Sequence, residues 1–171
     1  MRTLRDAFEK EYEAYEEPAN NKRGFRIRYR YKGPLYVIKS DREMLQKMKL
    51  YMAVIEMLCV ACFIIGAISE SIINYYSLSA ALATASVGAL IFEVIGVVCF
   101  LICKGQLKLH EYEQIEFMLK IVPVIYGVLL LIAAVAGFMI DSMVASLYGL
   151  AGVFSIAIFI LYRQVRYEKR W

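Results

Sequence analysis

Four long apolar stretches separate the sequence into its main parts and restrict the folds open to it. Together they contain two acidic residues and no Lys or Arg. A helix of about 20 apolar residues spans the ~30 Å hydrocarbon core of a bilayer. The stretches cover residues 50–68, 78–103, 121–140 and 143–162. We therefore predict an all-α integral membrane protein whose residues 50–171 form a four-helix transmembrane bundle.

The basic residues indicate which face of the membrane holds the two ends of the chain. Of the 20 Lys and Arg residues, thirteen precede the first span, three lie between the second and third spans, and four follow the fourth. The other two connections, residues 69–77 and 141–142, contain none. Lys and Arg beside a span are retained in the cytoplasm. We expect a multi-pass protein of the plasma membrane with both termini cytoplasmic.

Residues 1–49 precede the first span and are predicted to form a separate cytoplasmic N-terminal head. Apolar side chains at helical spacing predict a short helix over residues 1–17. Residues 25–31 alternate between apolar and basic side chains, which predicts a strand, and residues 35–38 could return beside it. The expected head is a small α+β unit, a short helix plus a β-hairpin.

The alternation in the head places its basic side chains on one face of the predicted strand. This face is expected to contact anionic lipid headgroups or a protein partner. No nucleic-acid recognition motif accompanies the charge, so nucleic acid is not expected as a partner. The residues are Arg26, Arg28, Arg30 and Lys32.

The junction between the head and the first span also carries a local signal. Ser40 followed by Glu43 matches a capping box, in which the two side chains satisfy free amide groups at a helix start. The pattern predicts a helix from Asp41 that runs unbroken into the first span.

Glu56 and Glu93 are the two ionisable residues within the spans. A charged group near the bilayer centre costs about 2.5 kcal/mol or more by insertion scales, so such residues usually have a partner or a function. The first two spans form an antiparallel pair, and the two carboxylates could meet if their helix faces match. They would then form a proton or cation site. Alternatively, each Glu is protonated and hydrogen-bonds a neighbouring helix.

The cysteines offer a second candidate chemistry, which we consider weaker. Cys59 and Cys62 have the C-x-x-C spacing of redox and metal sites, but they lie within a span, where cysteine packs as a small hydrophobe. The one histidine, His110, has no second strong metal ligand at a defined spacing. Phosphate-binding, nucleophile and paired acidic metal motifs are absent. We expect neither a metal, nor a cofactor, nor enzymatic catalysis.

Small residues recur on two of the spans and are predicted to let helix backbones approach closely. Ala85 and Gly88 lie in the second span, and Gly149 and Gly152 lie in the fourth. These faces could pack within the bundle, against a second copy of the chain, or against another membrane protein.

Together, these patterns favour a non-catalytic polytopic membrane protein, a subunit or scaffold of a membrane complex. It would bind the bilayer, a protein partner or a second copy of itself through its helix faces and basic head. The alternative is a small proton- or cation-coupled transporter that uses Glu56 and Glu93.

Overall fold

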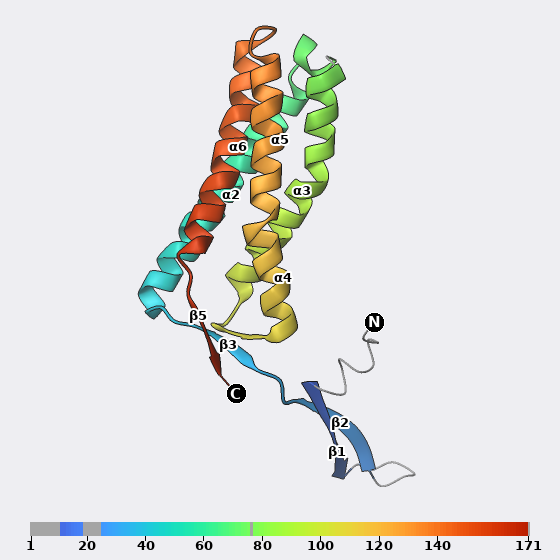
Figure 1. Ribbon diagram of the computed structural model, residues 1–171, viewed down its shortest axis with the longest axis vertical. Helices are drawn as coiled ribbons and strands as arrows, with labels where there is room; N and C mark the ends of the chain where they lie inside the picture. The colour runs from blue at the N-terminus through green and yellow to red at the C-terminus, as the bar shows by residue number, and fades with distance from the viewer. Residues whose placement is uncertain (1–10, 19–24, 76, 171) are drawn as a thin grey trace.

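The computed structural model describes residues 11–18, 25–75 and 77–170. Its long helices lie side by side, and its strands gather at one end, which we call the sheet end (Figure 1). The opposite end is called the loop end. The helices are α2 (Arg42–Ile68), the short 3-10 helix η1 (Ile72–Asn74), α3 (Ser77–Ile102), α4 (Leu109–Lys120), α5 (Val122–Gly137) and α6 (Ser142–Arg163).

Four helical stretches are long and apolar enough to cross a membrane, as the sequence predicts. One of them combines α4 and α5, which follow each other with only Ile121 between them. Pro123 lies in the first turn of α5, where a missing N–H breaks no hydrogen bond of that helix. The stretches are Arg42–Ile68, Leu78–Ile102, Leu109–Gly137 and Ser142–Arg163.

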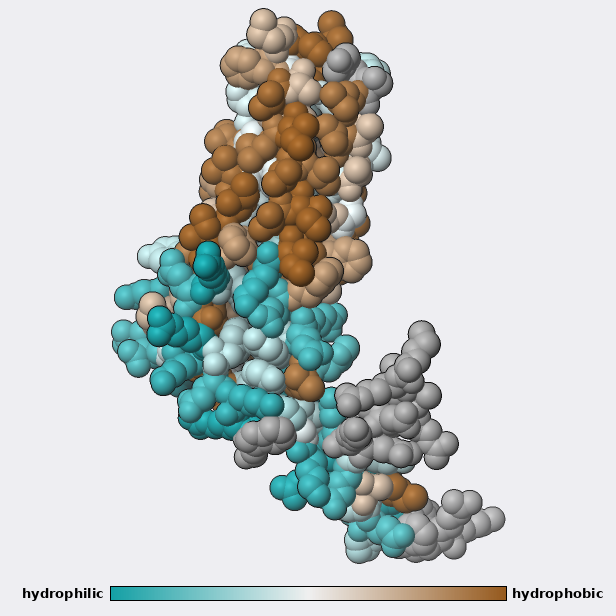
Figure 2. Space-filling view, in the orientation of Figure 1, coloured by the Kyte–Doolittle hydropathy of each residue, from teal (hydrophilic) through white to brown (hydrophobic). Residues whose placement is uncertain are grey.

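The surface of the molecule is apolar over most of the helices and hydrophilic at the sheet end. Apolar side chains cover the helices toward the loop end, and hydrophilic side chains cover the sheet end (Figure 2). Exposed apolar residues occur on all the long helices, including Met57, Ile102, Val135 and Met143. An apolar exterior of this kind is suited to contact with lipid.

The long helices pack in the order α2, α6, α5, α3. Helix α6 packs against both α2 and α5, α5 packs against α3, and the consecutive helices α2 and α3 contact each other far less. Where α5 meets α6, a Cβ added at Gly152 would lie 2.9 Å from the carbonyl oxygen of Gly127. The two glycines therefore permit a close approach of the backbones.

Buried apolar side chains form two clusters, one toward each end of the bundle. The sheet-end core consists of Ile38, Met48, Met52, Val97, Phe100, Leu107, Ile115, Leu119, Ile158, Tyr162 and Val165. The loop-end core consists of Cys59, Phe63, Ile73, Leu90, Tyr126, Leu130, Val144, Ala145, Tyr148 and Ala151.

The N-terminal segment differs from the expected helix. Strand β1 (Tyr12–Pro18) pairs antiparallel with β2 (Phe25–Tyr31), so the predicted helix is wrong over residues 12–17. Residues 1–10 lie outside the described residues. The register sets Glu13 opposite Arg30 and Glu17 opposite Arg26. Opposite charges across a strand pair are stabilising, and this complementarity favours the strand over a helix.

The predicted pairing of residues 25–31 with residues 35–38 is also wrong. Strand β3 (Leu35–Ile38) instead lies at the centre of a second sheet, between β4 (Gln106–Lys108) and β5 (Tyr167–Arg170), and both pairings are antiparallel. Both edges of β3 are therefore hydrogen-bonded, whereas pairing with β2 would have satisfied only one edge. The sheet joins the segments before the first, after the second and after the fourth apolar helix at one end of the bundle.

Aromatic side chains connect this sheet to the helices. The rings of Tyr36 and Tyr112 are stacked with centroids 4.1 Å apart, and Tyr167 meets the edge of Tyr112. The hydroxyl groups of Tyr162 and Tyr167 lie 3.1 Å apart, and burial raises the pKa of Tyr167. The sheet is therefore packed against the bundle and does not stand apart as a separate unit.

Helix α2 begins at Arg42 and continues to Ile68, which confirms the helix predicted to run into the first span. The predicted capping box is wrong. The N-cap is Asp41, and its side chain makes no capping hydrogen bond. The helix is instead held at this end by Lys49, whose ammonium group donates to the carbonyl oxygens of Leu101 (2.9 Å) and Cys103 (2.5 Å).

At the loop end, hydrogen bonds tie the two helix connections together. The Ser71 hydroxyl donates to the Asp141 carboxylate at 2.5 Å, and Asp141 also accepts from the amides of Met143 and Val144 at the start of α6. The Tyr148 hydroxyl donates to the Asn74 side chain at 2.7 Å. These contacts fix η1 against α6.

Candidate functional site

Glu56 and Glu93 are both buried, at 6% and 0% exposure. Along α2, Glu56 lies between Met52 of the sheet-end core and Cys59 of the loop-end core. Glu93 lies between Leu90 and Val97 on α3. The two carboxyl groups therefore occupy the boundary between the two apolar clusters and are buried inside the bundle, away from its apolar exterior.

Glu93 is held by a serine that the sequence marks only as a small residue. The Ser155 Oγ lies 2.7 and 2.8 Å from the two Glu93 carboxyl oxygens, and 2.8 Å from the Pro123 carbonyl oxygen. Ser155 has one hydroxyl hydrogen to share among these acceptors. If it donates to Pro123, the hydrogen between Ser155 and Glu93 must come from Glu93. The arrangement fits a protonated Glu93.

Glu56 has no comparable partner. Both of its carboxyl oxygens are buried without a hydrogen bond to any described residue, and the same holds for the hydroxyl of Tyr126. Cys59, one turn from Glu56, donates to the Ala151 carbonyl at 3.3 Å. A buried polar group without a partner costs about 1–3 kcal/mol, and more when it is charged. Glu56 is thus able to bind a proton or a ligand without giving up an existing hydrogen bond.

These residues form one group, which we call the buried polar cluster. Glu56 and Glu93 lie at the same level of the bundle, and Cys59 and Tyr126 are near enough to both carboxyl groups to interact electrostatically with either one when it is ionised. The cluster consists of Glu56, Cys59, Glu93, Tyr126 and Ser155, and it draws on α2, α3, α5 and α6.

The cluster contains two acidic groups and no basic one, and residues 50–68, 78–103, 121–140 and 143–162 contain no Lys or Arg. Two ionised carboxylates in this setting would repel each other and lose their hydration. Neutrality requires bound protons or a bound cation. Chemically, the arrangement can therefore hold a proton or a cation, which is one of the two alternatives that the sequence leaves open for the two glutamates.

Tyr126 and Ser155 belong to the site but were not predicted as part of it. Tyr126 lies in an apolar span with no charged neighbour in sequence. Ser155 lies at the helical spacing of Gly152, which indicates packing. A polar side chain at mid-span is the only signal that could have identified either residue.

The basic face predicted on residues 26–32 is exposed, but acidic residues of β1 lie beside it. Arg28 forms an ion pair with Glu17 at 2.6 Å, and Lys32 forms one with Glu13 at 3.5 Å. The register places Arg26 and Arg30 opposite acidic residues as well. The strand pair thus combines both charge signs on one face, and contact of this face with anionic lipid stays a prediction.

The small residues predicted to pack occupy different surroundings. Gly152 is buried against α5, and a Cβ at Gly149 would lie 3.6 Å from Ala134. Ala85 and Gly88 are exposed on α3, and a Cβ added at Gly88 would meet no atom within 4 Å. The second pair does not pack inside the bundle, and its contact with another chain stays a prediction.

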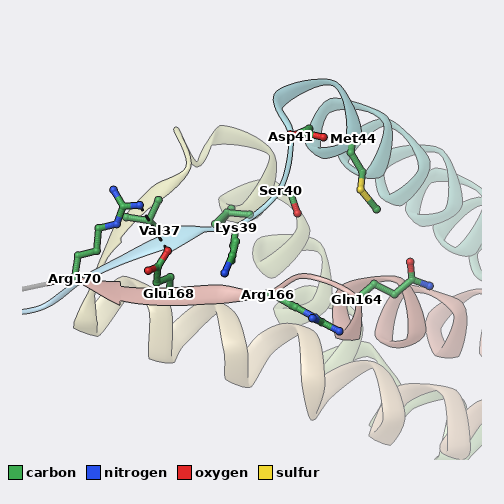
Figure 3. Close-up of a pocket in the computed structure, with 10 residues that line it drawn as sticks. Val37, Lys39, Ser40, Asp41, Met44, Gln164, Arg166, Glu168 and Arg170 are labelled. Atoms are coloured by element: carbon green, nitrogen blue, oxygen red, sulfur yellow. Dashed lines mark ion pairs between the residues drawn. The ribbon is translucent and has the colours of Figure 1, made fainter.

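A groove of about 670 Å³ lies at the sheet end, where the β3–α2 connection passes the α6–β5 connection (Figure 3). The amide of Lys39 donates to the Arg166 carbonyl at 2.9 Å, and Glu168 pairs with Arg170 at 3.6 Å. Both charge signs line this groove. Within the described parts of the chain, no group of three His, Cys, Asp or Glu residues is placed to hold a metal ion.

Comparison of the chain with protein-family models, with curated proteins and with solved structures found no match.

Proposed function

We propose that the protein is a small proton- or cation-coupled membrane transporter in which Glu56 and Glu93 form the ion site. The observation that carries the proposal is the burial of Glu56 without a described hydrogen-bond partner, at the same boundary between the two apolar clusters as a second buried carboxyl group. Ionisable residues inside membrane bundles commonly mark proton relays and ion pathways.

The proposed reaction is an exchange. Protons neutralise the buried polar cluster in one state, and a cation replaces at least one of them in the other. The four apolar helices would cross the plasma membrane with the sheet end in the cytoplasm, as the placement of the basic residues supports.

Proton release on cation binding tests the proposal directly. The full chain in weakly buffered detergent, with a pH indicator dye, would receive sodium, potassium or tetraphenylphosphonium chloride. We expect the wild-type chain to release protons with at least one of these cations. Because Gln cannot ionise, Glu56→Gln and Glu93→Gln should reduce the release to background.

The matched control is Glu70→Gln, which removes an exposed carboxylate at the loop end. It should release protons as the wild-type chain does. Release that is unchanged in both buried Gln variants, or absent from the wild-type chain with all three cations, contradicts the proposal.

A second candidate is a non-catalytic subunit or scaffold of a membrane complex. It is favoured by the β1–β2 strand pair, where Ile27 and Tyr29 are 53% and 58% exposed. Such apolar exposure on a strand surface is typical of a protein contact. The mass of the protein in mild detergent tests it, since a monomer without a co-purifying chain argues against a stable complex.

A further inference from the structure

A second pocket at the sheet end differs from the groove of Figure 3 in its charge. It has a volume of about 480 Å³ and lies between the start of α2 and the end of α3. Three of its lining residues are basic, Arg42, Lys49 and Lys104, and none is acidic. We call it the basic pocket.

The charges of this pocket are available to a ligand. Arg42 and Lys104 are exposed, and neither forms an ion pair with any residue that the structure describes. Lys49 uses two of its three ammonium hydrogens on the carbonyls at the end of α3. Among the residues that the structure describes, three cations surround one cavity without an acidic partner, which favours an anionic ligand.

The position of the pocket favours a lipid headgroup over a soluble anion. It lies where the hydrophilic sheet end meets the apolar helices, at the level expected for lipid headgroups if the helices cross a bilayer. The neighbours of its lining residues Lys49 and Cys103 are Leu50 and Ile102, which are 61% and 72% exposed. A charged cavity thus adjoins an apolar surface on the same two helices.

The packing of the helices leaves this side accessible. The pocket lies between α2 and α3, which contact each other far less than α6 contacts α2 or α5. Acyl chains can therefore extend from the pocket along both helices toward the loop end, over exposed apolar side chains that offer nothing to a soluble anion.

We propose that the basic pocket binds the phosphate-bearing headgroup of an anionic phospholipid, whose acyl chains lie along α2 and α3. The site is separate from the buried polar cluster and from the basic strand residues 26–32. It would anchor the lipid at the joint between the sheet and the first two apolar helices.

Native mass spectrometry of the full chain tests the proposal. The chain would be mixed with micelles containing equal amounts of phosphatidylglycerol and phosphatidylcholine, and bound lipids would be counted. We expect the wild-type chain to retain phosphatidylglycerol preferentially. The double variant Arg42→Gln, Lys104→Gln should bind it about 30-fold more weakly, since each basic residue near anionic lipid contributes about fivefold.

The matched control is Lys47→Gln, Arg163→Gln, which removes the same charge from exposed positions outside the pocket. It should retain phosphatidylglycerol within about twofold, because its effect is only long-range and screened. Equal losses in both double variants overturn the proposal. So does equal retention of the two lipids by the unaltered chain, a result that needs no variant to fold. Displacement of the bound lipid by inorganic phosphate would identify a soluble anion as the ligand and would also overturn it.

Discussion

Asp141 shows how one side chain can hold two connections together. Its carboxylate accepts from the Ser71 hydroxyl of the first connection and from two amides at the start of α6. The hydrogen bond from Ser71, followed by those from the amides, lowers the pKa of Asp141 below its ordinary value of 3.8. Asp141 therefore stabilises the fold in its ionised form.

This residue predicts a pH dependence of stability. A carboxyl group with a lowered folded pKa contributes stability above its ordinary pKa and loses it as the pH falls through the folded value. We expect Asp141→Asn to lower the Tm of the detergent-solubilised protein at neutral pH. The difference from the wild-type chain should persist to about pH 4 and shrink below that value.

Thermal unfolding followed by circular dichroism, at a series of pH values, measures this difference. Glu70→Gln is the control, because Glu70 has no hydrogen bond or ion pair with the described residues and lies at the same end. A difference between Asp141→Asn and the wild-type chain that stays constant down to the most acidic pH would contradict the assignment.

At the scale of single elements, the helices followed from composition, but their close contacts did not. An apolar stretch must become a helix in a bilayer whatever its neighbours are, because its amides have no other partner there. Which small residues meet depends on helix rotation and order. Gly152 meets α5, whereas Gly88 is exposed, although both were predicted to pack.

These two glycines give a matched pair of substitutions. Gly152→Ala places a methyl group 2.9 Å from the Gly127 carbonyl oxygen. Overpacking of this kind costs about 1–3 kcal/mol. Gly88→Ala meets no atom within 4 Å, and alanine is the better helix former by up to about 1 kcal/mol. We expect a lower Tm for the first variant and an unchanged or higher Tm for the second. Equal effects would contradict the packing of α5 on α6.

The strands show where local pattern fails as a guide. The pairing of β1 with β2 has a partial signal in the sequence, because Glu13 and Glu17 are complementary in charge to Arg30 and Arg26 across the strand pair. The pairing of β3 has no such signal, because β4 and β5 follow it by about 70 and 130 residues and are short and hydrophilic. The same limit applied to the buried polar cluster, where Ser155 lies 62 residues from Glu93.

At the scale of the whole molecule, the two ends differ in charge. The sheet end is hydrophilic and carries the described basic residues near helix ends (Figure 2), whereas the two connections at the loop end carry only the acidic residues Glu70 and Asp141 as charges. This asymmetry predicts the orientation in the membrane. Single cysteines would be introduced by Glu70→Cys, Gln106→Cys or Glu168→Cys into a chain whose four native cysteines are replaced by alanine.

In intact cells, a membrane-impermeant maleimide should label the Glu70→Cys variant. It should label the Gln106→Cys and Glu168→Cys variants only after the cells are permeabilised, because those positions lie at the sheet end. Labelling of all three from the same side would contradict four membrane crossings. A reversed pattern would place the sheet end outside the cell.

The order of the strands along the chain has a consequence for biosynthesis. Strand β3 emerges from the ribosome before any apolar helix, yet its partner β5 follows the fourth one. If the four apolar helices cross a bilayer, the sheet cannot close until the last of them has brought β5 to the same side as β3. A helix that failed to insert would carry β5 to the wrong side and leave at least one edge of β3 unpaired. Chains with a closed sheet would then be protected, whereas chains with an unpaired strand edge would be more exposed to proteolysis.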